Sequence, residues 1–444
     1  MKLPRIPAEP SEGGKIPEGD LEMIDRLQRE TFQYFVGEAN PANGLIRDAT
    51  RADSPSSIAV VGLGMTALAV GAERGFLPRE EAAQRVAAAL SFFYASPQGR
   101  EADSTGYRGF YYHFLDMKTG RRTWESELST MDTALLVAGA LSAAQYFDRD
   151  DLTEAKIRKT ADALYRRVDW NWALNRRATL SQGWRPETGF LSYRYQGYSE
   201  ALLLYLLALG SPTHPIPLES YAAWASTYSW KKVYGIEYLY AGPLFIHQLP
   251  QAWIDLREVQ DDFMRKYQLD YFQNTRRATL IHQEYAVRNP KGFAHYSRAC
   301  WGITASDGPG PATLMIDGVE RDFFGYCGRG APFGPDDGTI SPWAVVTSLP
   351  FAPERVSDTL RHFIHEIKLK DRQIYGLEAS FNPTFPDKTK HEEGWVSPWI
   401  LGLNEGPIVL MIENARNDFV WSLMRGCRYI ADGLRKAGFR GGWL

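Results

Sequence analysis

The chain has 444 residues, with 50 Lys and Arg against 53 Asp and Glu, and a formal net charge of −3 at pH 7. This balance gives no basic face for nucleic acid, and no apolar segment is long enough to cross a bilayer. Cys300, Cys327 and Cys427 leave at least one thiol unpaired and provide neither a disulfide framework nor a paired-cysteine metal site.

Residues 1–19 are polar and rich in Pro and Gly, so we expect a flexible N-terminal arm. No linker or charge run divides the remainder, which predicts a single domain over residues 20–444. The first residues contain no apolar run of signal-peptide length. We expect a periplasmic or secreted protein whose signal has been removed, with a cytoplasmic protein as the alternative, and a monomer or dimer.

Helices that are apolar all round alternate with amphipathic helices through the first half of the chain. Asp20 can cap a first helix over residues 21–37. The apolar helices are predicted over residues 56–72, 128–147 and 197–210, and amphipathic helices follow them over residues 79–95, 152–168 and 218–228. The best strand candidate is residues 108–116, which contain the run Phe-Tyr-Tyr.

The same alternation continues in the second half. Apolar segments cover residues 244–253, 340–349 and 406–411, and charged or amphipathic helices cover residues 256–288, 354–369 and 419–437. Residues 289–338 are rich in Gly and Pro and predict loops. The predicted fold class is all-α: an (α/α)6 toroid whose long loops form a cleft at one end. An α-solenoid is the alternative, and it would require a clearer sequence period.

Carboxylates are the groups left to carry chemistry. The eight His show no metal-ligand spacing, and neither a phosphate-binding loop nor a nucleophile elbow is present, so we expect no metal and no cofactor. Glu200 lies at the mouth of one apolar helix, and Asp132 lies in the first turn of another, with Glu127 just before it. Glycoside hydrolysis uses two carboxyl groups on opposite sides of the scissile bond. The competing interpretation is structural: Ser129 and Asp132 fit a capping box, and the helix dipole alone favours Glu200.

Aromatic residues are abundant, with 13 Trp, 23 Tyr and 22 Phe. Many of them fall in segments rich in Gly and Pro, where rings could line a surface that binds the apolar faces of sugars. For any single ring, packing in the core is the alternative interpretation. From the cleft loops we expect sugar contacts at Asp48, Arg51, Trp184, Tyr198, Trp395 and Trp399.

An ordered set of segments resembles the bacterial β-1,2-glucanases of glycoside hydrolase family 144, which have a glycoamylase-like domain. The segments are SSIA (56–59), GAERG (71–75), ELSTMDTA (127–134), LYRRVDW (164–170), GYSEA (197–201), LGSPTHP (209–215), GPLF (242–245), WGITASDGP (301–309), SLPFAPE (348–354) and GPIVLMIEN (406–414). They extend over nearly the whole chain from about residue 24.

The resemblance implies an (α/α)6 barrel and the hydrolysis of β-1,2-glucan to sophoro-oligosaccharides, with inversion and without a metal. The family's acid in the Gly-Tyr-x-Glu-Ala motif corresponds to Glu200, which would be the general acid. The acid of the Ser-Thr-x-Asp motif corresponds to Asp132, and either Asp132 or Glu127 would activate water or hold the sugar. Trp301 and Asp307 would be subsite residues.

Some segments depart from the family pattern, namely residues 249–252, Asn404 with Glu405, and the loops 306–338 and 378–395. These departures leave chain length, linkage and the choice between endo and exo action open. Two other functions remain as alternatives: a sugar lyase or epimerase on the same fold, and a non-catalytic glycan-binding protein.

Overall fold

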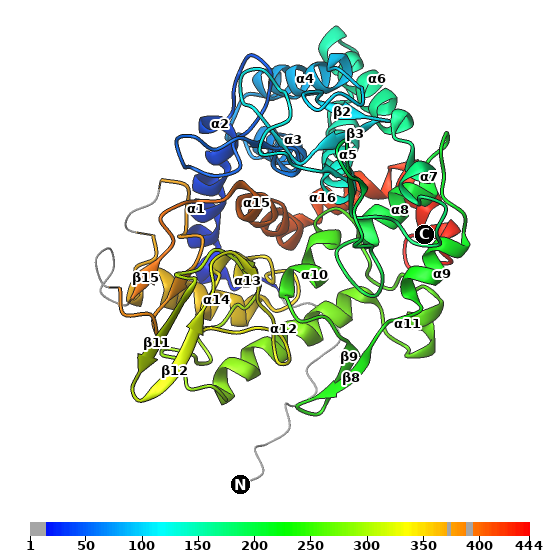
Figure 1. Ribbon diagram of the computed structural model, residues 1–444. Coiled ribbons are helices and arrows are strands. Elements are labelled where there is room, and N and C mark those ends of the chain that lie inside the picture. The colour runs from blue at the N-terminus through cyan, green and yellow to red at the C-terminus, as the bar shows by residue number, and fades with distance from the viewer. Residues whose placement is uncertain (1–14, 371–373, 388–393) are drawn as a thin grey trace.

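The computed structural model describes residues 15–370, 374–387 and 394–444. Helices account for 45% and strands for 13%, so the protein is mostly helical, with more strand than the predicted all-α class. Figure 1 shows the helices from α1 to α15 arranged around the molecule broadly in chain order, whereas α16 lies beside α5. Across the described ranges, no helix is both long enough and apolar enough to span a membrane. Residues 1–14 of the predicted arm lie outside the described residues, and Glu18–Asp20 forms the short 3-10 helix η1.

A set of buried helices confirms the predicted apolar segments. They are α3 (Ile58–Glu73), α5 (Thr130–Tyr146), α8 (Leu202–Gly210), α10 (Leu244–Gln248), which the 3-10 helix η2 (Leu249–Ala252) extends, α13 (Pro342–Val346) and α15 (Gly402–Asn417). Within this set α15 contacts α3, α3 contacts α5, α5 contacts α8, and α13 contacts α15. Nearly all the side chains of α3 and α8 are apolar, so these helices need cover on all sides, whereas α10 and α15 also bury polar groups such as His247 and Glu413.

Each buried helix contacts a more polar partner. The pairs are α3 with α4 (Arg79–Ala95), α5 with α6 (Leu152–Arg167), α8 with α17 (Arg428–Lys436), α10 with α12 (Tyr271–Arg288), α13 with α14 (Pro353–Arg361), and α15 with α1 (Leu21–Phe32). Shorter helices complete the set: α2 (Tyr34–Gly37), α7 (Trp170–Ala173), α9 (Glu219–Ala225), α11 (Asp262–Lys266), the π-helix η3 (His362–Glu366) and α16 (Phe419–Arg425).

The partner of α8 differs from the one expected from chain order. The segment after α8 forms only the seven-residue α9, and the extensive contact comes from α17, near the end of the sequence. Glycines explain the close fit, because a Cβ atom at Gly210 would collide with the carbonyl of Tyr429, and one at Gly433 with the carbonyl of Leu206. A close approach brings more atoms into van der Waals contact, so α17 covers the apolar surface of α8 better than α9 does.

Glycines also set the spacing of α3 and α5. A Cβ atom at Gly62 would collide with the carbonyl of Leu135, and one at Gly139 would collide with the carbonyl of Gly62. The two helices therefore touch backbone to backbone at this point. Helix packing is the interpretation that the sequence favours for Gly62 and Gly64, and it is confirmed for Gly62.

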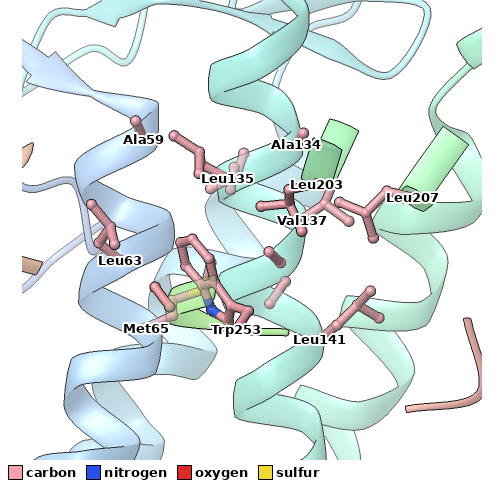
Figure 2. Close-up of a cluster of buried hydrophobic side chains, with 14 of the residues drawn as sticks. Ala59, Leu63, Met65, Ala134, Leu135, Val137, Leu141, Leu203, Leu207 and Trp253 are labelled. Carbon is pink, nitrogen blue, oxygen red and sulfur yellow. The ribbon is translucent and has the colours of Figure 1, made fainter. Parts of the chain in front are cut away.

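The core beside this contact is centred on Trp253. Figure 2 shows its indole among side chains of α3 and α5, close to Met65. The indole N–H donates to Thr66 Oγ1 at 3.0 Å, and Thr66 Oγ1 lies 2.6 Å from Ser142 Oγ on α5. This buried polar chain satisfies three groups that would otherwise be costly to bury.

Short strands make up the connections. One sheet has five antiparallel strands in the order β2 (Gly106–Tyr107), β3 (Phe110–Tyr112), β5 (Leu128–Ser129), β6 (Gly183–Arg185) and β7 (Gly189–Phe190). Strand pairs are β1 (Ser56–Ser57) with β4 (Phe114–Leu115), β8 (Trp230–Val233) with β9 (Ile236–Leu239), β10 (Ala305–Ser306) with β13 (Cys327–Gly328), β11 (Ala312–Ile316) with β12 (Val319–Phe323), and β14 (Phe381–Asn382) with β15 (Trp395–Val396). The predicted strand at residues 108–116 is confirmed by β3 and β4.

Candidate active site

Two acids lie where the five-stranded sheet passes into α5. β5 leads directly into Thr130, and the side chain of Ser129 accepts a hydrogen bond from the backbone N–H of Asp132 at 3.1 Å. The predicted capping role of Ser129 is therefore confirmed. The cap fixes Asp132 in the first turn of α5, and Glu127 lies immediately before β5.

His113 connects these two acids. Its backbone N–H donates to the carbonyl of Glu127 at 2.9 Å. Its Nδ1 atom lies 3.0 Å from Glu127 Oε1 and 3.6 Å from Asp132 Oδ2. Burial opposes the charging of His113, but the nearby Asp132, Glu127 and Asp48 carboxylates outweigh it and raise the pKa of His113 to about 9. At neutral pH the imidazole is therefore a cation shared by two carboxylates.

The ligand atoms of His113, Glu127 and Asp132 lie within 4.8 Å of one another, a spacing at which three such groups could hold a metal ion. A metal would first have to displace the proton from the imidazole, because only the neutral ring is a ligand. The ion pairs already account for the arrangement of the three side chains.

Asp48 approaches the same point from another segment. Its neighbour Arg47 pairs with Ser56, next to the β1–β4 pair that leads to His113. Burial raises the pKa of Asp48 to about 6, with the cation of His113 opposing the shift and the carboxylate of Asp132 adding to it. Asp48 therefore titrates closer to neutrality than an exposed aspartate.

Glu200 lies in the turn before α8, at the mouth of the helix as the sequence predicts. Gly197 at the start of this turn has φ 82°, a conformation that suits glycine. Burial raises the pKa of Glu200 to about 7; a backbone hydrogen bond opposes the shift, and the Asp132 carboxylate adds to it. Desolvation is therefore the main cause of the raised pKa of Glu200.

Glu127 is shifted in the opposite direction. Burial alone would raise the pKa of Glu127, but the hydrogen bond and charge of His113 outweigh it, so its pKa is lowered. Tyr195 lies close enough to Glu200, Asp132 and Glu127 for all three carboxylates to raise its pKa, after burial as the main cause. We call Asp48, Glu127, Asp132 and Glu200 the acid cluster. Within it, the pKa values of Glu200 and Asp48 are raised and the pKa of Glu127 is lowered.

A fifth carboxylate, Asp307, is linked to another wall of the site. Its Oδ2 accepts a hydrogen bond from Ser397 Oγ at 3.1 Å, and Ser397 Oγ also donates to the carbonyl of Trp399 at 3.1 Å. Trp399 is 38% exposed. The segment continues to Gly402, whose N–H donates to the carbonyl of Asp48 at 2.8 Å. Asp307 and Trp399 thus belong to a wall that joins the acid cluster at Asp48.

Comparison with known proteins identifies the family of the chain. The family model "Glycoamylase: Putative glucoamylase" matches residues 192–428, more than half of the chain. The chain belongs to the Glycoamylase family. A crystal structure of a "putative glucoamylase" from Bacteroides uniformis ATCC 8492 is 31% identical, has a TM-score of 0.84, and is matched over 96% of this chain and 98% of that one.

Two further relatives of this Glycoamylase family chain have more specific names. The endo-β-1,2-glucanase from Chitinophaga pinensis, solved with sophorotriose and glucose, is 27% identical with a TM-score of 0.83, over 95% of this chain and 99% of that one. The exo β-1,2-glucooligosaccharide sophorohydrolase (non-reducing end) of Parabacteroides distasonis is 27% identical over 95% of this chain. The chain spans 58% of the length of that curated relative.

Two of the expected sugar contacts in this Glycoamylase family member need correction. Trp301 has no exposed surface, and its indole donates to Thr359 at 2.8 Å within the core. Trp184 pairs with Leu128 across β5 and β6, and side chains alternate between the faces of a strand, so Trp184 lies on the sheet face opposite Glu127. Trp184 packs there against Tyr107 and Trp172. Composition locates aromatic loops, but it does not tell which way a ring faces.

The other expected residues are placed as follows. Arg51 forms an ion pair with Asp53 at 2.7 Å, and its charge opposes the raised pKa of Asp48, so it lies beside the acid cluster. Tyr198 packs against Tyr228, His247 and Tyr271, and burial raises its pKa, so it supports the Glu200 turn. Trp395 is half-buried in β15, two residues before Ser397.

Sequence reasoning missed two residues at this site. His113 has no recognisable motif, because its contact with Glu127 depends on the pairing of β3 with β5. Trp124 is 55% exposed, lies beside Phe114, and has the guanidinium carbon of Arg51 5.4 Å from its ring centroid. Its φ of 55° is strained for a non-glycine residue, and such strain is often found at functional sites.

Proposed function

We propose that this protein is a glycoside hydrolase that cleaves β-1,2-linked glucans with Glu200 as its general acid. The observation that carries the proposal is the opposite direction of two pKa shifts within the acid cluster. Glu200 has a pKa of about 7, whereas the pKa of Glu127 is lowered. A site that separates two carboxyl groups in this way can hold a protonated carboxylic acid beside an ionised carboxylate at the same pH.

In the proposed reaction, Glu200 protonates the glycosidic oxygen of the bond that breaks. A carboxylate on the other side of the sugar, Asp132 or Glu127, removes a proton from the attacking water, so the configuration at the anomeric carbon is inverted. Inverting enzymes hold the two carboxyl groups about 6.5–9.5 Å apart to leave room for that water. Asp132 is the stronger candidate, because its charge acts on Glu200 and that of Glu127 does not, and because Glu127 lies closer to His113, at 3.0 Å against 3.6 Å for Asp132.

The substrate part of the proposal rests on the relatives. Two proteins that match 95% of this chain are named for action on β-1,2-linked glucans, one as an endo enzyme and one as an exo enzyme. We further propose that the six contacting pairs of helices form an (α/α)6 toroid over residues 20–444, with the acid cluster in a cleft at one end.

The experiment that tests the proposal is a reducing-end assay of the wild-type protein on linear β-1,2-glucan and on β-1,3-, β-1,4- and α-1,4-glucans. We expect release from β-1,2-glucan, with the first product formed as the α-anomer by NMR. A ladder of products would indicate endo action, and sophorose alone would indicate exo action. Binding without release would favour the glycan-binding alternative, and an unsaturated product absorbing in the ultraviolet would favour a lyase.

A further inference from the structure

The pairing of β10 with β13 places Tyr326 beside Asp307. In this antiparallel pair Ser306 is opposite Cys327, so the next positions, Asp307 and Tyr326, face each other just beyond the pair. Asp307 is joined through Ser397 and Trp399 to the wall that reaches Asp48. Tyr326 therefore extends from a loop at the border of the acid cluster.

A buried arginine holds this loop in place. Arg329 has no exposed surface and forms two hydrogen bonds with Asp337, at 2.7 and 2.8 Å. The same guanidinium donates to the carbonyls of Phe324 and Gly325, at 3.0 and 3.1 Å, and to the carbonyl of Ser306 at 2.8 Å. The backbone on both sides of the β10–β13 pair is thus fixed by one side chain, which leaves the position of Tyr326 well defined.

The side chain of Tyr326 is 63% exposed although its surroundings are crowded. Crowding by neighbouring atoms raises the pKa of its hydroxyl, and the charges of Asp48, Asp132, Asp307 and Glu200 add to the shift. The ring is therefore open to solvent and lies near four carboxylates from separate segments. No hydrogen bond joins its hydroxyl to another group in the described part of the chain, and a neutral phenol can both donate and accept.

We propose that Tyr326 binds the sugar next to the acid cluster, with its hydroxyl hydrogen-bonded to a sugar hydroxyl and its ring against the sugar face. The inference rests on the proposed function, because it takes the partner of this exposed ring to be the glucan. Tyr326 is a substrate-binding residue in this proposal, and it neither gives nor takes the proton of the reaction. Arg329 acts through the loop and positions it.

The test compares Tyr326→Phe and Tyr326→Ala with wild type in steady-state hydrolysis of linear β-1,2-glucan and of sophoro-oligosaccharides of defined length. Tyr326→Phe is expected to lower kcat/KM about fivefold, the effect of one lost hydrogen bond. Tyr326→Ala is expected to lower it by about tenfold or more, mainly through KM, because the apolar ring surface is lost as well. Both variants should keep the wild-type unfolding temperature, because the side chain is exposed.

The matched control is Tyr94→Phe, at a tyrosine that is 54% exposed near the end of α4. It should leave kcat/KM unchanged. If wild type hydrolyses β-1,2-glucan and both Tyr326 variants stay within twofold of it, the role of Tyr326 is wrong and the proposed function stands. If wild type hydrolyses no β-1,2-glucan, both proposals are overturned together.

Discussion

The Nδ1 atom of His113 lies 3.0 Å from Oε1 of Glu127, and this contact fixes the charge of both groups. The pKa of the His113 imidazole is raised to about 9, and its hydrogen bond and charge lower the pKa of Glu127. No cation of the described residues acts on Glu200, and burial raises its pKa to about 7. One histidine therefore separates the acids of the site into an ionised member and a protonated one.

Replacing Glu200 with Gln should abolish hydrolysis and leave folding intact. The amide has nearly the same shape but carries no transferable proton, and general acid catalysis contributes about 10²–10⁴-fold to rate. The measurement is kcat by reducing-end release, alongside the thermal unfolding midpoint. Glu219→Gln, at an exposed residue in the first turn of α9, is the control and should behave like wild type. Turnover at the wild-type rate by the Glu200 variant would contradict its role.

Replacing Asp132 with Asn should move the alkaline limb of the pH profile to lower pH. The negative charge of Asp132 helps to raise the pKa of Glu200, so its removal lets Glu200 lose its proton at a lower pH. If Asp132 also activates water, kcat should fall by about 10²–10⁴-fold as well. The measurement is kcat/KM as a function of pH.

Glu127→Gln is the comparison for that profile, because Glu127 is not among the groups that shift the pKa of Glu200. It should leave the alkaline limb near pH 7. An unmoved limb together with unchanged kcat in the Asp132 variant would remove Asp132 from the catalytic machinery.

Replacing His113 with Asn should flatten the dependence of stability on pH between about 6.5 and 9. The folded-state pKa of His113 is raised from 6.5 to about 9, so its contribution to the free energy of unfolding is complete below pH 6.5 and is lost as the pH rises through 9. Wild type should therefore lose more stability across this window than the variant. Denaturant unfolding at pH 6.5 and pH 9 measures both slopes, and equal slopes would show that His113 is not charged as described.

Replacing Gly139 with Ala should destabilise the fold by about 1–3 kcal/mol, as overpacking in a core typically does. The added Cβ atom would collide with the carbonyl of Gly62, and only separation of α3 from α5 could relieve the contact. Gly19→Ala is the control, because a Cβ atom there meets nothing within 4 Å. Guanidinium unfolding midpoints of the two variants provide the measurement, and equal midpoints would mean that the helices separate at no cost.

The long apolar helices could be predicted from the sequence because their signal is local. The runs around α3, α5 and α8 lack charge over several turns, and that pattern has one good structural explanation. The five-stranded sheet could not be predicted as a whole, since strands of two or three residues are too short to show a period. Glu200 and Asp132 could be predicted because each lies at the start of an apolar helix. His113 could not be predicted, because strand pairing between segments far apart in the sequence brings it to the site.

The direction in which a side chain faces also could not be predicted from the sequence. Trp184 and Trp301 have the same loop-like, aromatic surroundings in sequence as Trp399, yet Trp301 is buried in the core and Trp184 lies on the far face of a sheet. The difference arises from strand alternation and from the packing of distant segments. A single sequence contains no local signal for either.

The glycine contacts between α3 and α5, and between α8 and α17, have a consequence for how such a protein can diverge. The acids at the starts of α5 and α8 take their positions from main-chain surfaces in direct contact, and a change of side chain elsewhere hardly moves them. Trp124 and Trp399 lie instead on connections between helices and strands, which tolerate changes of length more readily. Related proteins could therefore change their ligand specificity through these connections while keeping the same arrangement of acids.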